Sequence, residues 1–189
     1  SHMSDTLGLY FQYITRNSQD YMPLNQEYRH AILYCEIQKL RFEGRIRVET
    51  DDLPAEYSSI LVPKLIIQPI LENAFNYGLR NKVDDGLLKV AVSNHDSELI
   101  ISIEDNGDDL SDAQLEKIQA NLQSASTGDP LREMTGILNI QRRLSIYSDG
   151  SSHLTAIRSP LGGLCIQLFL PIQQSPGKER ETHDKNIVS

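Results

Sequence analysis

Three short segments of the sequence carry polar residues that could bind a charged ligand. The first, Gln68-Pro-Ile-Leu-Glu-Asn-Ala-Phe-Asn-Tyr-Gly78, places Glu72, Asn73 and Asn76 as neighbours in an otherwise apolar helical pattern. The carboxamide oxygen of Asn73 suits a hard cation such as Mg²⁺, and the carboxylate of Glu72 could polarise an attacking group or orient a water molecule. On its own, the segment favours an amphipathic helix with a polar edge.

The second segment, Ile101-Ser-Ile-Glu-Asp-Asn-Gly107, ends an alternating strand pattern with an acidic residue. An ionised Asp105 accepts a hydrogen bond from an exocyclic amine such as N6 of adenine, which guanine does not offer at that edge. Gly107 lets the backbone turn and approach a ligand closely. The same tripeptide is also a common hairpin signal, so both interpretations stay open here.

The third segment, Thr135-Gly-Ile-Leu-Asn-Ile-Gln-Arg-Arg-Leu144, begins a helix with a glycine. The unpaired N–H groups and positive dipole end at Gly136 suit a triphosphate, and Arg142 or Arg143 could add positive charge or simply face solvent. The alternative is an ordinary helix with a glycine near its N-terminus.

Composition limits the classes of protein to which the chain can belong. The 189 residues suit one domain with appendages, and 39% hydrophobic content is ordinary for a soluble protein. A net charge of −8 argues against nucleic-acid binding but not against ATP, which can be held by Mg²⁺ and backbone N–H groups. No stretch is long and apolar enough to span a bilayer. Cys35 and Cys165 are expected to be reduced core residues.

The apolar periodicities predict alternating helices and strands. The expected helices are residues 25–43, 63–78, 112–122 and 136–148. In the first, Asn25 is the expected N-cap and Gly44 the residue that ends the helix. Pro63 is expected to open the second helix, and Pro69 to kink it. The expected strands are residues 45–49, 87–93, 98–104, 152–158 and 164–170, with a turn at 94–97. We therefore predict an α+β fold, a two-layer sandwich with a mixed, mostly antiparallel sheet and helices on one face.

The polar stretches at both ends divide the chain. Residues 1–3 look like a cloning scar, and residues 4–24 like the remnant of an upstream helical or linker region. The domain itself is expected at residues 25–172. Residues 123–132 are expected to be mobile, and residues 173–189 to form a disordered tail.

The order and spacing of the three segments resemble those of the conserved boxes in the catalytic domain of sensor histidine kinases. These kinases belong to the gyrase, Hsp90, histidine kinase and MutL ATPase superfamily. Residues 68–78 are similar to the asparagine box of the YesM/LytS-like kinases. Residues 105–109 are similar to their Asp-Asn-Gly-x-Gly box, and residues 136–144 to their Gly-Leu-x-Asn-x-x-x-Arg-Leu box. The resemblance covers about residues 7–172 and implies the Bergerat type of ATP-binding fold.

The resemblance also implies roles for single residues. Asn73 would bind Mg²⁺, Glu72 would assist the attacking histidine, and Asp105 would bind the adenine of ATP above the turn at Gly107. Further contacts to the nucleotide would come from Asn76, Tyr77, Asp109, Leu110, Thr135, Gly136, Ile137 and Leu138. Residues 108–135 would form a mobile ATP lid.

Four residues depart from the family pattern. Asp109 and Met134 stand where glycines are usual, Tyr77 where this subgroup has His, and Leu164 where many members have Thr. The phosphoacceptor Pro-His-Phe motif is also missing. His30, His95, His153 and His183 are therefore expected to be surface or structural residues.

The function implied by the resemblance is transfer of the ATP γ-phosphoryl group to a histidine outside this sequence. The implied partners are the protein's own dimerisation and phosphoacceptor helices, a response regulator and a second copy in a homodimer, with no contact to nucleic acid or membrane. The implied location is the cytoplasmic part of a membrane-anchored sensor. The alternatives are a nucleotide-binding pseudokinase or interaction module, a gyrase- or Hsp90-like ATPase, and a serine kinase of the anti-sigma-factor type.

Overall fold

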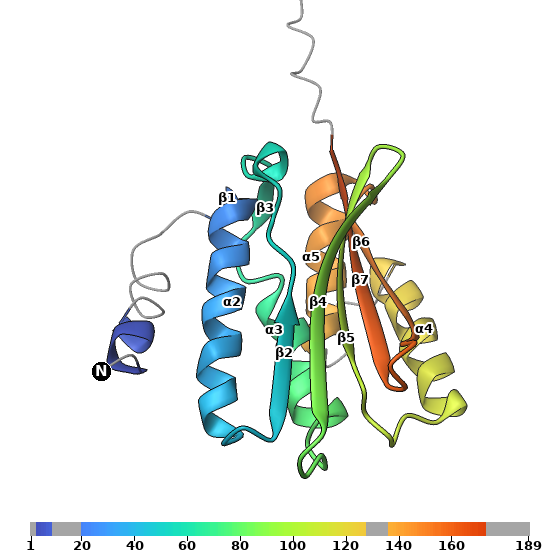
Figure 1. The fold of residues 1–189 in the computed structure, drawn as a ribbon. Coiled ribbons are helices and arrows are strands. Elements are labelled where there is room, and N and C mark those ends of the chain that lie inside the picture. The colour runs from blue at the N-terminus through green and yellow to red at the C-terminus, as the bar shows by residue number, and fades with distance from the viewer. Residues whose placement is uncertain (1–2, 9–19, 128–135, 173–189) are drawn as a thin grey trace, which may run out of the picture.

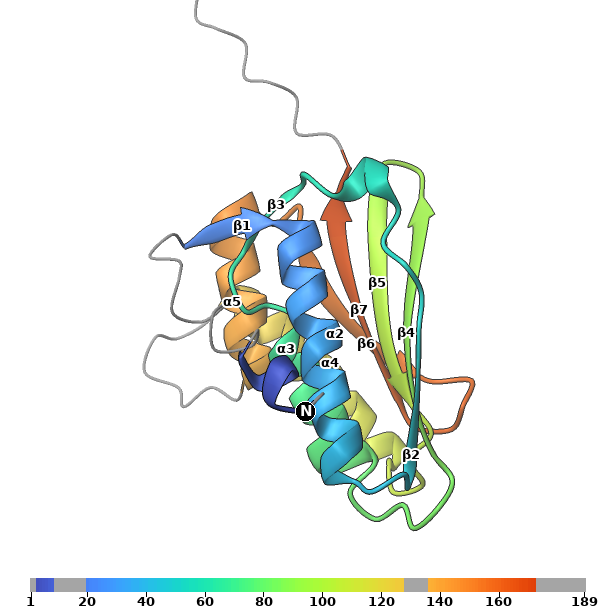
Figure 2. The same ribbon diagram turned by 60° about the vertical axis from the view of Figure 1, so that its left-hand side comes forward.

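A five-stranded sheet covered on one face by helices forms the body of the protein (Figures 1 and 2). The computed structural model describes residues 3–8, 20–127 and 136–172. Besides a short helix at residues 3–8, its helical elements are α2 (Leu24–Arg41), η1 (Ala55–Tyr57), α3 (Gln68–Asn73), η2 (Ala74–Gly78), α4 (Asp112–Thr127) and α5 (Gly136–Ser148). Its strands are β1 (Tyr21–Pro23), β2 (Ile46–Thr50), β3 (Leu61–Pro63), β4 (Gly86–His95), β5 (Glu98–Asp105), β6 (His153–Arg158) and β7 (Leu164–Pro171).

The strand order β2-β4-β5-β7-β6 makes the sheet mixed and mostly antiparallel. Only β2 and β4 run parallel, and the chain between them crosses over through α3 and η2. The β4–β5 hairpin closes with His95 opposite Glu98. The predicted α+β sandwich and its hairpins are therefore confirmed.

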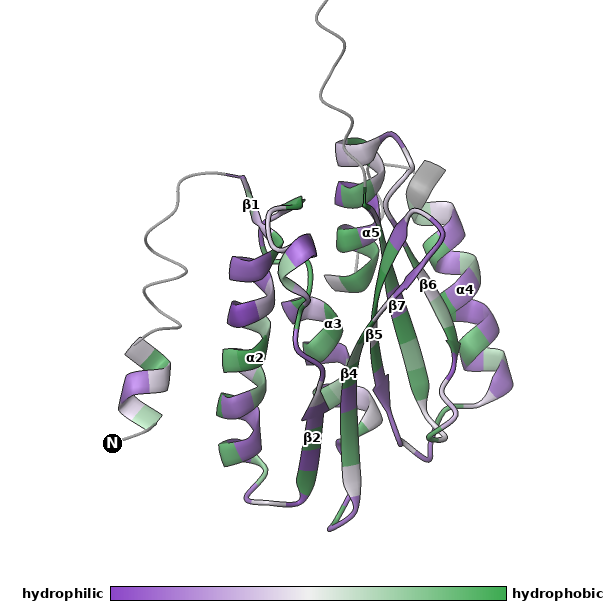
Figure 3. Cartoon of the chain, turned by 45° about the horizontal axis from the view of Figure 1, so that its top comes forward, coloured by the Kyte–Doolittle hydropathy of each residue, from purple (hydrophilic) through white to green (hydrophobic). Residues whose placement is uncertain are grey.

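Alternation of apolar and polar residues explains why the sheet has one covered face. Every second residue of β5 is buried, with Leu99, Ile101 and Ile103 pointing into the core beneath the helices. Figure 3 shows the two kinds of residue as bands along the strands and helices. None of the helices in the described ranges is both long and apolar enough to cross a membrane.

Helix α2 begins one residue earlier than expected. Asn25 is not its N-cap, because Pro23 holds that position and no side chain caps the helix. The first N–H groups of the helix instead donate to loop carbonyls, Leu24 N to Ile60 O at 2.7 Å and Asn25 N to Ser58 O at 3.1 Å. A loop distant in sequence thus replaces the local cap that the sequence predicted.

The predicted helix start at Pro63 is wrong. Pro63 ends β3, which pairs with β1 in a small second sheet, and α3 begins only at Gln68 with Pro69 in its first turn. Leu65, between the two elements, has a positive φ of 59°. This sharp bend explains why the apolar run could not continue as one helix.

The buried carboxylate of Glu27 stabilises that bend. Its side chain on α2 is fully buried and accepts hydrogen bonds from the backbone N–H groups of Leu65 at 3.1 Å, Ile66 at 2.9 Å and Ile67 at 3.4 Å. Arg143 of α5 also donates to Lys64 O at 2.5 Å. Helices α2 and α5 therefore fix the entry into α3.

The region after Leu122 also differs from the prediction. Residues 123–127, expected to be mobile, continue α4, because Leu122 and Ala125 are buried and hold its C-terminal turns against the domain. Packing of these apolar side chains outweighs the weak helix propensity of the serines in this stretch. Residues 128–132 of the expected mobile segment, residues 173–189 and His183 lie outside the described residues.

The two cysteines lie in the core as expected, and the described histidines His30, His95 and His153 are structural or surface residues. Cys35 and Cys165 are free and buried. Burial lowers the pKa of His30 to about 4, so this side chain is neutral in the core at pH 7. His95 is exposed, and His153 stacks on Phe169 with 4.7 Å between ring centroids.

We predict that Glu27→Ala lowers the free energy of unfolding by about 3 kcal/mol, because three N–H groups at the bend lose their acceptor. Urea denaturation measures this difference. The matched control is Glu36→Ala on the same helix, whose ion pair with Lys39 is exposed and should change the stability by less than about 0.5 kcal/mol. Equal effects of the two substitutions would contradict the role assigned to Glu27.

Candidate functional site

A cavity of about 600 Å³ opens between α3, η2, the end of β5, α4 and the start of α5. Its size is typical of a site for a small molecule or cofactor. The predicted site residues that line it are Glu72, Asn73, Asn76, Tyr77, Asp105, Gly107, Asp109, Leu110, Gly136, Ile137 and Leu138. Thr135 lies outside the described residues, as does Met134. The fold thus brings three segments that are distant in sequence to one cavity.

The asparagine segment forms one wall of the cavity at a change of helix type. Glu72 and Asn73 end α3, and the chain then widens into the π-helical turn η2, closed by the bond from Leu79 N to Ala74 O at 2.9 Å. Such π turns are frequent at functional sites. Gln68 donates to Glu72 Oε1 at 2.8 Å, which orients this carboxylate along the helix.

Asp105, at the end of β5, also lines the cavity and is almost entirely buried, with 2% of its surface exposed. Burial raises the pKa of its carboxyl group, whereas hydrogen bonds from the backbone N–H groups of Gly107 and Leu164 act against that rise. The bond from Gly107 N to Asp105 Oδ1 measures 2.8 Å. These donors orient the carboxylate within the cavity.

Three glycines make room for this carboxylate. A Cβ atom on Gly78, Gly107 or Gly163 would collide with the side chain of Asp105. We call these three residues the glycine cradle. They come from η2, from the turn after β5 and from the turn before β7, so three parts of the chain must meet without side chains at one carboxylate. Gly107 was recognised from the sequence, whereas Gly78 was interpreted only as the last residue of the asparagine box, and no role was predicted for Gly163.

Asn106, between Asp105 and Gly107 in the same box, uses its side chain for structural hydrogen bonds. Its Nδ2 donates to Asp85 O at 2.8 Å, and its Oδ1 accepts from Leu87 N at 2.8 Å. These bonds attach the β5 turn to the start of β4. Asn106 does not line the cavity.

The segment that follows Gly107 is held by side chains of the loop after η2. Lys82 is largely buried and pairs with Asp108 at 2.7 Å and with Asp85 at 3.7 Å. Asn81 donates to Asp109 Oδ2 at 2.8 Å. Asp109, which replaces the second glycine of the Asp-Asn-Gly-x-Gly box, therefore accepts a side-chain hydrogen bond that a glycine could not accept.

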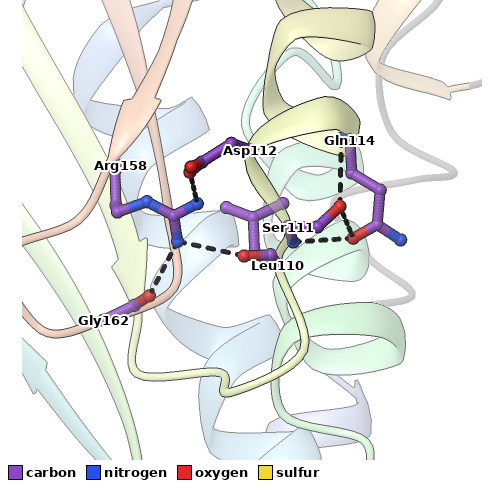
Figure 4. A network of polar contacts seen from close by, with 6 residues as sticks. All are labelled: Leu110, Ser111, Asp112, Gln114, Arg158 and Gly162. Carbon is purple, nitrogen blue, oxygen red and sulfur yellow. Dashed lines mark hydrogen bonds and ion pairs between the residues drawn. The ribbon is translucent and has the colours of Figure 1, made fainter.

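The first turn of α4 is anchored from the other side by Arg158 of β6. Its guanidinium donates to Leu110 O at 3.1 Å, to Gly162 O at 3.4 Å and to Asp112 Oδ1 at 2.7 Å (Figure 4).

A capping box completes the start of this helix. Ser111 Oγ accepts from Gln114 N at 3.2 Å, and Gln114 Oε1 accepts from Ser111 N at 2.8 Å (Figure 4). Residues 108–112, expected to open a mobile lid, are thus fixed by contacts on both sides.

One face of α4 forms a wall of the cavity that the sequence interpretation missed. It consists of Gln114, Lys117, Ile118, Asn121 and Leu122, and we call it the α4 wall. These positions are spaced by three and four residues and so share one helical face. That spacing was visible in the sequence, but it was used only to predict a helix at residues 112–122.

Arg143, considered as a source of positive charge for a phosphate, lies elsewhere. It donates to the backbone carbonyls of Lys64 and Leu65 near α3, and it does not line the cavity. Arg142 does not line the cavity either. In the described ranges, no three His, Cys, Asp or Glu side chains gather as a metal site.

The sheet order, the helical layer and the position of the cavity define a Bergerat-type two-layer sandwich. The sequence profile of the histidine kinase-, DNA gyrase B-, and HSP90-like ATPases matches residues 60–174, more than half of the chain. The chain therefore belongs to this ATPase family, as the three boxes predicted.

Similar proteins of known class agree with this family assignment. The chain is 29% identical to sensor histidine kinase BtsS of Escherichia coli K12 over 106 residues, which cover 56% of this chain and 19% of the relative. It is 29% identical to sensor histidine kinase YesM of Bacillus subtilis over 146 residues, which cover 77% of this chain and 23% of the relative. The match thus spans about a fifth of the length of these relatives.

A solved structure agrees on the fold. The ATP binding domain of PrrB from Mycobacterium tuberculosis superposes with a TM-score of 0.52 at 16% identity, covering 81% of this chain and 98% of that domain.

We predict that Gly163→Ala lowers the free energy of unfolding by about 2 kcal/mol or more, because the new methyl group meets the carboxylate of Asp105 and the backbone around it. Thermal unfolding provides the measurement. Gly8→Ala is the control, since no atom lies within 4 Å of a Cβ added there. If both variants unfold like the original chain, the glycine cradle is not a close-packed site.

Proposed function

We propose that this chain binds Mg-ATP and serves as the catalytic domain of a sensor histidine kinase. The observation that carries the proposal is the meeting of three polar segments at one cavity. A buried, oriented carboxylate at Asp105, the oxygen donors of Glu72 and Asn73 and the glycine start of α5 all line it. The names of the matched relatives support the same activity.

The part of the cavity near Asp105 suits adenine. An ionised carboxylate accepts a hydrogen bond from the N6 amine, and the apolar side chains of Leu110, Ile118 and Leu164 line the cavity with it. The cavity leaves room for a base at this place because the glycine cradle has no side chains. Selectivity against guanine follows, since guanine presents a carbonyl where adenine presents the amine.

The part of the cavity lined by Asn73 and Gly136 suits phosphates and a magnesium ion. The positive end of the α5 dipole lies at Gly136 and favours anions. Asn73, with Asn76 and Glu72 beside it, offers the few oxygen ligands that Mg²⁺ needs, because this ion keeps several waters and binds phosphate oxygens. When bound, the ion would neutralise charge on the phosphates.

The proposed reaction transfers the γ-phosphoryl group to a histidine of the dimerisation helices, outside this sequence. An imidazole nitrogen forms a bond to the γ-phosphorus, the bond between that phosphorus and the β–γ bridging oxygen breaks, and ADP leaves. Glu72 would orient the attacking imidazole and accept its proton. The site's contribution is mainly positioning.

We further propose that the full protein works as a homodimer in the cytoplasmic part of a membrane-anchored sensor. The phosphoryl group would then pass to a response regulator. The structure of a related kinase, ThkA, in complex with its response regulator TrrA supports that class of partner.

We predict that Glu72→Gln, introduced into the full-length protein, leaves the affinity for Mg-ATP within about threefold but slows autophosphorylation at least tenfold, because the amide cannot accept the proton. Radiolabelled ATP measures both quantities. Glu98→Gln, at the far end of β5, is the control. A label that is stable in acid would indicate a serine kinase, and binding without transfer in the unsubstituted protein would indicate a pseudokinase.

We predict separately that Asn73→Ala weakens binding of ATP at least fivefold in the presence of Mg²⁺ but has little effect in EDTA, because the substitution removes an oxygen ligand of the ion. Calorimetry under both conditions measures the difference. An equal loss with and without Mg²⁺ would show that Asn73 is not the metal ligand.

A further inference from the structure

The cavity has an unbalanced set of charges for a site that would hold a triphosphate. Its described lining includes three acidic side chains, Glu72, Asp105 and Asp109, and a single cationic one, Lys117 of the α4 wall. One Mg²⁺ ion offsets only part of the charge of ATP. A further positive group near the phosphates would therefore raise affinity considerably.

Three other cationic side chains that the structure describes on the surrounding elements are already committed to structural contacts. Lys82 pairs with Asp108 and Asp85, Arg143 donates to backbone carbonyls at the bend before α3, and Arg158 anchors the first turn of α4. In the part of the chain that the structure describes, no ion pair involves Lys117. Lys117 is thus the cation that a ligand can recruit without breaking a contact of the fold.

The position of Lys117 along α4 fits the phosphates better than the base. Arg158 ties Asp112, at the start of the helix, to Gly162, which adjoins the glycine cradle and hence the Asp105 side. With a rise of about 1.5 Å per residue, Lys117 lies about 7 to 8 Å further along the helix. Leu122, beyond it, lines the cavity together with the start of α5 at Gly136. Lys117 therefore lies on the cavity wall, beyond the part of α4 that Arg158 ties to the Asp105 side.

We propose that Lys117 forms an ion pair with the phosphate chain of the bound nucleotide and is a binding residue of this site. This inference rests on the proposed function and names a residue that none of the three sequence boxes contains. The lysine side chain is long and exposed, so it can follow the phosphates as the nucleotide enters. Its contribution should grow with the number of phosphates and should vanish for adenosine.

The test compares adenosine, ADP and ATP, each with Mg²⁺, as ligands of the chain and of three variants. Lys117→Gln should bind ATP about tenfold more weakly and adenosine unchanged, with ADP between them. Lys117→Arg keeps the charge and should restore ATP affinity to within about threefold. Lys89→Gln, on the solvent face of β4, is the matched control and should change nothing. Chemical-shift titration measures all the affinities.

The result that overturns the inference is distinguishable from failure of the proposed function. If the unsubstituted chain binds ATP and Lys117→Gln binds it equally well, or loses adenosine and ATP to the same extent, Lys117 does not contact the phosphates. If the unsubstituted chain binds none of the three ligands, the proposed function and the inference are both wrong.

Discussion

Burial of one carboxylate is the constraint on which the site depends. An ionised Asp105 in a nearly water-free position is costly unless backbone donors surround it, and such donors can approach only where no side chain intervenes. The glycine cradle satisfies this requirement with residues from η2, from the β5 turn and from the β7 turn. The cavity forms where these three segments meet.

The remaining polar contacts around the cavity serve to hold its walls in place. Glu27 and Arg143 fix the bend that precedes α3 and thereby set the position of Glu72 and Asn73. Lys82 and Arg158 fix the segment between β5 and α4 from its two sides. All four are charged groups that bond to backbone groups or to aspartate carboxylates, so the walls are positioned by the fold before a ligand enters.

The sequence was sufficient to predict the layers of the fold and most of the cavity lining. Alternation along β4 and β5 and the compact boxes around Asn73, Asp105 and Gly136 are local signals, and local signals can be read from one sequence. Contacts between distant segments could not be predicted in this way. Glu27 looks like an ordinary polar residue of an amphipathic helix, because its acceptor role depends on N–H groups 38 to 40 residues away. The β1–β3 pair is three residues long on each side and leaves no periodic trace.

The most direct test of the account is whether Asp105 recognises the 6-amino group of adenine. The affinities of ATP and of purine riboside triphosphate, which lacks that amine, are measured for the chain and for Asp105→Asn. The account predicts that the unsubstituted chain prefers ATP by about tenfold or more, and that Asp105→Asn loses this preference. If the preference is absent in the chain, or survives unchanged in the variant, Asp105 does not bind adenine and the proposed orientation of the nucleotide is wrong.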